Sequence, residues 1–208
     1  MSLEFCSVQP AADHPDDRRR IIEAAYRCLS RPHPGPILMS EILRRAQVST
    51  RAFYRHFDSK DDLFLALLQQ ECDALVAEVD RIAAAALGSP AEQLAAWIGE
   101  MFELCSDPHR RINLAVIDSD EVRAARGYRE TRARAQADRE RSLTEILRRG
   151  RADGSFPLAD PDFDAVAVSA LAARVLAAQV PDDPQELKQA QGRVLDFALR
   201  AVGAVPRV

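Results

Sequence analysis

The positions of twelve prolines constrain the fold of this chain more than any other feature of its sequence. A helix interior excludes proline, and the residue before each proline is pushed out of the helical region. Between the clumps of prolines, apolar residues recur at helical spacing, as at Ile21, Ala25 and Leu29, and no strand-like alternation of any length occurs. The sequence therefore predicts an all-α protein of about nine helices. We expect these helices over residues 16–31, 37–46, 49–57, 59–87, 91–105, 110–125, 127–153, 161–180 and 184–202.

Length and composition bound the class of protein. A chain of 208 residues has room for one or two domains. Its 47% hydrophobic and 29% charged residues are typical of folded proteins and argue against wholesale disorder. No apolar run approaches the roughly 20 residues that a bilayer requires, and the first fifteen residues lack the features of a secretory signal. We expect a cytoplasmic protein that does not contact a membrane.

The cysteines predict neither a metal site nor a cofactor. They form no C-x-x-C pair, which excludes a zinc ribbon and a thioredoxin-like motif. Cys105 and His109 have a helical spacing, but Asp107–Pro108 between them predicts a break. An enzyme using Cys105, His109 and Asp118 as nucleophile, base and orienting residue would need spatial convergence and an activated thiolate, which the sequence does not show. The four cysteines are Cys6, Cys28, Cys72 and Cys105.

The net charge of −4 conceals an asymmetry along the chain. Residues 17–60 hold ten Lys or Arg and four acidic residues, a net charge of +6. The remaining 18 basic and 28 acidic residues give −10 elsewhere. A basic region of this kind suits an anionic partner. A solvated basic surface would give the same counts, so charge alone does not decide between the two.

Residues 37–57 have the layout of a helix-turn-helix. Two short helices are separated by a tight break at 47–49. On the second helix, Phe53 and Phe57 share a face that we expect to be buried. A small packed helical hairpin would show the same periodicity, and spacing alone leaves both interpretations open. After this segment, Ser59 precedes two acids and predicts the start of the next helix.

The opposite side of the second helix carries residues suited to DNA. Arg51 and Arg55 point away from the two phenylalanines. The planar fork of arginine can bind guanine or phosphate, and the hydroxyl of Tyr54 can donate to phosphate. If Ser49 caps this helix, backbone N–H groups at its start are available to a phosphate. These residue types favour a nucleic-acid partner.

Residues 21–63 resemble the N-terminal DNA-binding region of the tetracycline-repressor (TetR) family. The matching stretches are IIEAA at 21–25, EI at 41–42 and AQVSTRAFYRHFDSKDDL at 46–63. The most specific part is the pattern Y-x-x-F-x-S-K. It consists of Tyr54, Phe57, Ser59 and Lys60.

The resemblance implies a homodimer that presents its first three helices to double-stranded DNA at an inverted-repeat operator. The later helices would bind a small-molecule effector and dimerise, with the final two forming the dimer interface. The implied organisation is a disordered arm at 1–15, a helix-turn-helix domain at 16–60 and an effector-binding and dimerisation domain at 61–208. The DNA-contact positions carried over from the family are Ser49, Thr50, Arg51, Ala52, Tyr54, Arg55 and Lys60, with Ser40 and Arg44 as phosphate neighbours.

The chain departs from the family pattern in three features. Gln47 occupies a turn position where glycine is usual, and a non-glycine residue at positive φ costs on the order of 1 kcal/mol. His33 replaces the glycine that commonly ends the first helix. Ile37 and Leu38 stand where small hydroxyl residues usually cap the second helix, so we expect that helix to lack its cap.

The larger C-terminal region contains candidate effector-binding residues on helical faces. They carry few charges, which favours a lipophilic effector, although ordinary core packing would use the same residues. We predict a dimeric ligand-responsive repressor that an effector releases from its operator. The alternative is a helical interaction protein with a degenerate DNA-binding domain. The candidate pocket residues are Trp97, Met101, Phe102 and Cys105, with Val116, Leu171 and Val175 as opposite walls.

Overall fold

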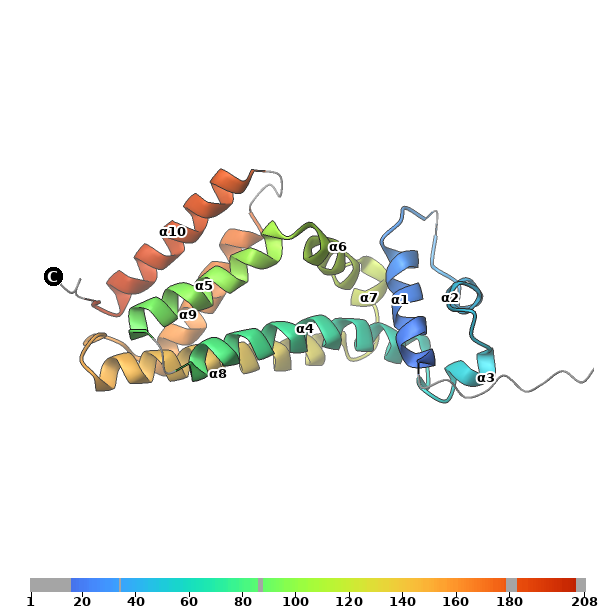
Figure 1. The fold of residues 1–208 in the computed structure, drawn as a ribbon, viewed down its shortest axis with the longest axis horizontal. Coiled ribbons are helices and arrows are strands. Elements are labelled where there is room, and N and C mark those ends of the chain that lie inside the picture. Colours follow the sequence, from blue (N-terminus) through green and yellow to red (C-terminus); the bar gives the residue numbers. More distant parts are fainter. Residues whose placement is uncertain (1–15, 34, 86–87, 179–182, 205–208) are drawn as a thin grey trace, which may run out of the picture. The chain divides into compact units, whose positions relative to one another are not determined.

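The structure is a computed structural model that describes residues 16–33, 35–85, 88–178 and 183–204, except for the side chains of Leu104 and Cys105. The described residues form helices and no strands, which confirms the all-α prediction. The predicted arm at 1–15 lies outside the described residues. Ten helices are present in the described part of the chain (Figure 1). They are α1 (Asp17–Leu29), α2 (Met39–Ala46), α3 (Thr50–Phe53), α4 (Lys60–Ala84), α5 (Pro90–Ser106), α6 (Pro108–Ile117), α7 (Asp120–Arg123), α8 (Tyr128–Ala152), α9 (Pro161–Leu176) and α10 (Pro184–Ala201).

Two helices differ from the sequence prediction. The single helix expected over 110–125 is divided into α6 and α7, because Ser119 starts a new helix by accepting a hydrogen bond from the Val122 amide at 3.5 Å. The α3 helix is shorter than the expected 49–57. After Phe53 the backbone turns through hydrogen bonds of shorter span, such as His56 N to Phe53 O at 2.9 Å. Apolar spacing does not reveal either change.

The prolines mark where helices start, as the sequence pattern indicates. In four of the described helices the first residue is a proline, which has no N–H that needs a partner. The residue before each of these prolines accepts hydrogen bonds from backbone N–H groups of the first turn. Asp107, for example, accepts from two amides of α6 at 2.7 and 3.1 Å. The predicted break at Asp107–Pro108 is confirmed, because α5 ends at Ser106. The helices that begin in this way are α5 at Pro90, α6 at Pro108, α9 at Pro161 and α10 at Pro184.

The chain forms two compact units, Met1–Leu63 and Phe64–Val208. In the first unit, α1 packs against α2 and α3 around a small apolar core. Ile21 of α1, Ile42 of α2 and Leu63 are fully buried. Phe53 joins this core, and its ring lies 5.5 Å from that of Phe57. The burial that the sequence predicts for these two phenylalanines is confirmed.

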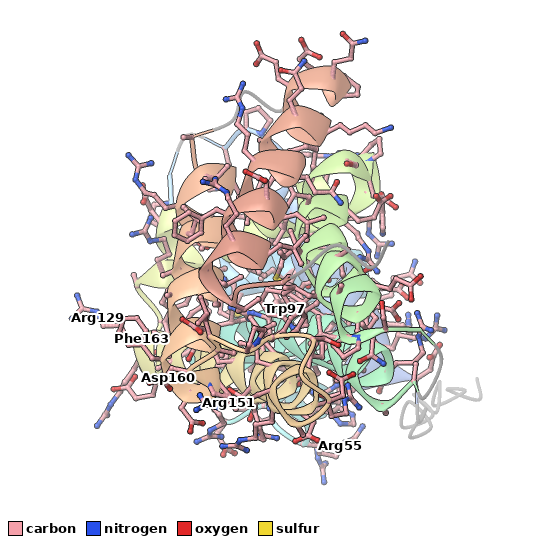
Figure 2. The ribbon with its side chains drawn as sticks, turned by 90° about the vertical axis from the view of Figure 1, so that its left-hand side faces the viewer. Arg55, Trp97, Arg129, Arg151, Asp160 and Phe163 are labelled. Carbon is pink, nitrogen blue, oxygen red and sulfur yellow. The ribbon has the colours of Figure 1, made fainter. Side chains whose placement is uncertain are left out.

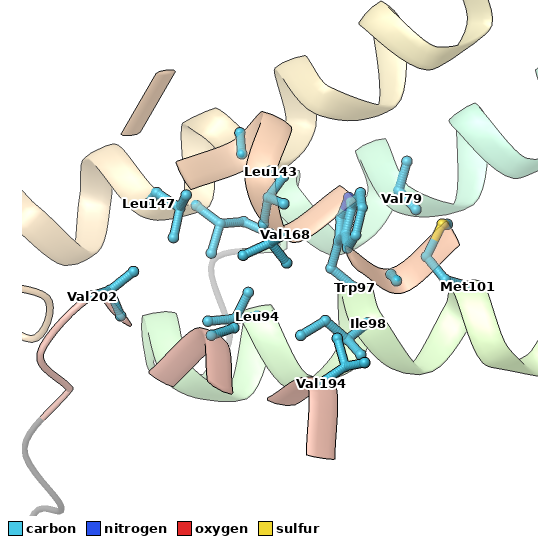
Figure 3. Packing of buried hydrophobic residues seen from close by; sticks show 14 of the residues in the cluster. Val79, Leu94, Trp97, Ile98, Met101, Leu143, Leu147, Val168, Val194 and Val202 are labelled. Carbon is cyan, nitrogen blue, oxygen red and sulfur yellow. The ribbon is translucent and has the colours of Figure 1, made fainter. Parts of the chain in front are cut away.

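The second unit is a helical bundle in which α5 packs against α6, α8, α9 and α10. Its apolar core includes residues of α4, α5, α8, α9 and α10. Trp97 lies inside the bundle (Figure 2), among side chains that include Val79, Leu143 and Val168 (Figure 3). Gly150 of α8 approaches the Phe156 ring so closely that a Cβ atom would overlap it. No helix in the described part of the chain is both long and apolar enough to span a membrane.

Candidate functional site

The turn between α2 and α3 is held in a left-handed conformation at Gln47. Its φ of 56° makes it the one described non-glycine residue with a positive φ, which confirms that it occupies the glycine position. From α1, Nη2 of Arg20 donates to the backbone carbonyl and to Oε1 of Gln47, at 3.4 Å in each case. Nη1 of Arg20 also pairs with Asp17 at 3.4 Å. An arginine of α1 therefore stabilises a turn that lacks glycine.

The start of α3 has the predicted N-cap. The hydroxyl of Ser49 accepts a hydrogen bond from the Ala52 amide at 3.1 Å. Ala52 is buried, so its methyl group packs inward. The other residues of this segment to which the family resemblance assigns DNA contacts are exposed. Tyr54 is 61% exposed, and its ring stands edge-on to Phe53 with the ring centroids 5.3 Å apart. The exposed residues of the segment are Ser49, Thr50, Arg51, Tyr54 and Arg55.

Asp17 is a buried carboxylate that the sequence analysis did not single out. Its side chain is 9% exposed, and it faces Arg20 and Arg55. Oδ2 of Asp17 lies 3.8 Å from Nη2 of Arg55. The arginine is thereby drawn toward α1 in this structure. Sequence spacing could not show this pairing, because Asp17 and Arg55 lie on different helices.

On α2, Ser40 and Arg44 are exposed, as expected of phosphate neighbours. Arg44 binds Glu41 through two nitrogens, at 3.1 Å from Nε and 2.8 Å from Nη2. Arg45 also donates to Glu41, at 2.8 Å. The hydrogen bond from Arg44 lowers the pKa of the Glu41 carboxyl below its ordinary value. This ion pair orders Arg44 along the surface of α2.

Lys60 ties the start of α4 to the segment before α2. Its Nζ donates to the carbonyl of Ile37 at 2.6 Å, and its side chain is half-buried. The N-cap of α2 is Leu38, which makes no side-chain capping bond, so the predicted loss of that cap is confirmed. By contrast, Ser59 Oγ accepts from the Asp62 amide at 3.1 Å at the start of α4, as predicted.

The structure brings five of the seven candidate effector residues into or against one apolar cluster. Trp97, Met101 and Phe102 are buried in the core of the second unit, and Leu171 and Val175 pack against that core. Val116 is buried but lies outside this cluster, and the side chain of Cys105 is outside the described part of the structure. Two described cavities have volumes of about 550 and 680 Å³, and none of the seven candidates lines either. The smaller is lined by residues that include Arg81, Glu100 and Gln191, and the larger by residues that include Ser155, Phe156 and Arg200.

Asp118 and His109, two of the residues considered for an enzyme, lie in different surroundings. Asp118 accepts a hydrogen bond from the Tyr128 hydroxyl at 3.0 Å and pairs with Arg132 at 3.5 Å. His109 is exposed near the start of α6. The described contacts of Asp118 therefore do not include His109.

Comparison with known proteins identifies the first unit. The model of the family described as bacterial regulatory proteins, tetR family, matches residues 21–67. These residues contain the α2–α3 turn and the exposed residues of the segment 49–55 that follows it. Over these residues the chain is similar to TetR-family regulators. TetR-family proteins are regulators of transcription, not enzymes.

A curated relative of this chain is the HTH-type transcriptional repressor KstR of Mycolicibacterium smegmatis. The two are 32% identical over 84 residues, which cover 40% of this chain and 41% of KstR. The match thus spans about two fifths of the length of that relative.

Solved structures resemble the chain over most of its length. SmeT, the repressor of the Stenotrophomonas maltophilia multidrug efflux pump SmeDEF, is known as a complex with triclosan. That structure matches with a TM-score of 0.73 and 24% identity, over 92% of this chain and 98% of SmeT. FadR from Bacillus subtilis, in complex with stearoyl-CoA, matches with a TM-score of 0.70 and 20% identity, over 88% of this chain and 98% of FadR. At these identities the likeness establishes a shared fold.

Proposed function

We propose that this protein is a TetR-family transcriptional repressor that binds an inverted-repeat operator as a homodimer and is released by a small lipophilic effector. The observation that carries the proposal is the division of side chains around α3. Phe53 and Phe57 pack inward, while Arg51 and Tyr54 are exposed beside the Ser49 cap. An arginine fork and a phenolic hydroxyl on one exposed segment suit base edges and phosphates.

Each of the two units has its own role in this proposal. We assign DNA binding to residues 16–60 and effector binding with dimerisation to residues 61–208, in the cytoplasm. A ligand that binds one arrangement of the dimer more tightly than another shifts the population toward it, and so changes the affinity for DNA. The relatives support a lipophilic effector, since SmeT is known with triclosan and FadR with stearoyl-CoA.

The last two helices supply a surface for a second copy of the chain. Three large apolar side chains on α9 and α10 are strongly exposed: Phe163 at 69%, Val166 at 49% and Phe197 at 47%. Figure 2 shows Phe163 at the outer edge of the bundle. Exposed apolar side chains on two adjacent helices mark an interaction surface, and a two-fold dimer would bury the same surface from both copies. Two-fold symmetry then requires an inverted repeat in the DNA.

Fluorescence anisotropy on DNA from around the protein's own gene tests the proposal. We expect binding that is tighter than to scrambled DNA and that strengthens as salt is lowered, because phosphate contacts release counterions. The salt series separates this electrostatic contribution from sequence preference. If neither this DNA nor a wider set of random duplexes binds selectively, the alternative of an interaction protein with a degenerate DNA-binding domain replaces the repressor.

Dimerisation is tested separately by light scattering after gel filtration. Val166→Asp and Phe197→Asp place a charge on the α9–α10 surface, and we expect each to shift the protein toward a monomer. Ile112→Asp is the matched control, since Ile112 is also an exposed apolar residue, 50% accessible, but lies on α6. An equal shift in the control variant would contradict the assignment of the interface.

A further inference from the structure

Arg139 of α8 is a half-buried cation for which the described residues supply no hydrogen bond and no ion pair. Another half-buried arginine of the second unit is paired with a carboxylate: Arg110 donates to Glu100 at 2.6 Å. Removing a charged group from water is costly unless another group compensates it. The arrangement around Arg139 therefore lacks an acceptor.

The surroundings of Arg139 are cationic. Arg132, Ala135 and Arg139 follow one another at spacings of three and four, so they share a face of α8. Ala135 is buried, which identifies this face as the inward one. Burial lowers the pKa of Arg139, and the charge of Arg132 lowers it further. Glu140, the adjacent carboxylate, instead accepts a hydrogen bond from Gln136 at 2.8 Å.

Across from this face, α4 contributes no acid that ion-pairs with Arg139 among the described residues. The α4 residue whose pKa is coupled to both arginines is Cys72, a buried thiol. Burial raises the pKa of this thiol, so it is neutral at physiological pH. Glu71, the preceding residue, accepts a hydrogen bond from Asn113 at 2.8 Å. Arg132 pairs with Asp118 at 3.5 Å, whereas no carboxylate among the described residues forms an ion pair with Arg139.

A second donor in the same unit also lacks an acceptor. Nε1 of Trp97 is buried and has no hydrogen-bond partner, although an indole N–H can only donate. Trp97 belongs to the apolar cluster that contains Leu143, which follows Arg139 by one helical turn (Figure 3). A buried polar group without a partner costs on the order of 1–3 kcal/mol. A ligand with acceptor oxygens at one end would supply a partner for Arg139 and leave its apolar part to contact the cluster around Trp97.

We propose that the effector is an anionic amphiphile whose acidic group pairs with Arg139 and whose apolar body lies against the cluster around Trp97. This inference rests on the proposed function, in which the second unit binds an effector. The guanidinium offers two parallel N–H donors that match a carboxylate. Leu143, one turn beyond Arg139 on α8, belongs to the apolar cluster, which also contains Leu75 of α4 and Met101 of α5 and suits a hydrocarbon chain or ring. The positive charge at one end and the apolar surface beyond it define the chemical class of the effector.

Trp97 supplies the readout, because it is the single tryptophan of the chain. Its emission is followed while the protein without DNA is titrated with decanoate, decanol and methyl decanoate, which share a chain length and differ in charge. We expect decanoate to bind about tenfold or more tightly than either neutral compound, since an ion-paired hydrogen bond is lost in both. Equal affinity for the three compounds, or no change in Trp97 emission with any of them, would overturn the proposal.

Variants of α8 test which positive charge causes the preference for decanoate over the neutral compounds. Arg139→Gln should bind decanoate and decanol with similar affinity, and Arg139→Lys should retain part of the preference because it keeps a positive charge. Arg134→Gln is the matched control, since Arg134 is an exposed arginine of the same helix. Far-UV circular dichroism establishes that each variant is folded. A preference for decanoate that survives Arg139→Gln would assign the anion to another group and overturn the proposal.

The titration contains no DNA, so its outcome is distinguishable from failure of the repressor assignment. Selective operator binding without a carboxylate preference would remove only the effector class. A carboxylate preference without operator binding would leave a ligand-binding protein and remove the repressor.

Discussion

The first unit fixes its helices through polar contacts to backbone atoms, whereas the second unit relies on a continuous apolar core. In the first, Arg20 donates to the carbonyl of Gln47, and Lys60 donates to that of Ile37. In the second, long helices meet at fully buried residues such as Trp97. A helix as short as α3 has too little apolar surface for packing alone to fix its position. Polar contacts to its flanking segments supply what packing cannot.

The difference has a functional consequence. A segment held by individual hydrogen bonds places exposed residues accurately and is sensitive to the loss of one donor. A bundle held by packing is sensitive instead to volume. The following experiments test this contrast, beginning with the largest expected effect.

Adding one methyl group to α8 should destabilise the second unit. Gly150→Ala places a Cβ against the buried ring of Phe156, and overpacking of this kind costs about 1–3 kcal/mol. Gly192→Ala is the matched control on α10, where nothing lies within 4 Å of the added atom. We expect the control to be neutral or to gain up to about 1 kcal/mol from helix propensity. Urea denaturation followed by circular dichroism measures both, and equal stability of the two variants would contradict a core limited by volume.

The exposed residues of the first unit should affect DNA binding and not folding. Arg51→Ala should weaken operator binding by about 1–3 kcal/mol, which is about 5- to 160-fold. Tyr54→Phe should have a smaller effect, because it removes one neutral hydroxyl. Anisotropy titrations give the affinities, and light scattering checks that both variants remain dimeric. A loss of the dimer in Arg51→Ala equal to its loss of DNA binding would show that the residue acts elsewhere.

The contact between α1 and the turn should contribute to the stability of the first unit. Arg20→Ala removes the donor to Gln47 and the partner of Asp17, and we expect a loss of about 1 kcal/mol. Arg19→Ala is the matched control, because Arg19 pairs only with exposed carboxylates at Asp16 and Glu23. Hydrogen exchange of the turn amides reports the change locally. Unaltered protection in Arg20→Ala would mean that the turn does not depend on this arginine.

The smallest effect is expected at the turn itself. Gln47→Gly relieves a left-handed non-glycine residue and should raise the stability by up to about 1 kcal/mol. Gln47→Ala keeps the left-handed conformation and loses the Oε1 contact with Arg20, so we expect a slight loss. Thermal unfolding compares the pair. If Gln47→Gly is less stable than the wild type, the side-chain contact with Arg20 outweighs the backbone strain.

Much of the local structure was predictable from neighbouring residues in the sequence. The caps at Ser49 and Ser59, the break before Pro108 and the left-handed turn at Gln47 all follow from interactions within a few positions. The division of the helix expected over 110–125 was missed, because the apolar pattern continues through Ser119 while the hydrogen bonds do not. The exposure of Arg51 and Tyr54 was predictable for the same local reason, but the pairing of Arg55 with Asp17 was not.

Most helices, and the segment that resembles a DNA-binding helix-turn-helix, were predictable because spacing, capping and proline effects act over one or two turns. The packing of distant helices, by contrast, sets which polar groups have partners. Arg139 resembles many other arginines of this chain in the sequence, and Trp97 resembles any core aromatic. Their lack of acceptors emerges only when distant helices pack together, because a hydrogen-bond partner is set by distance in space and not by distance along the chain.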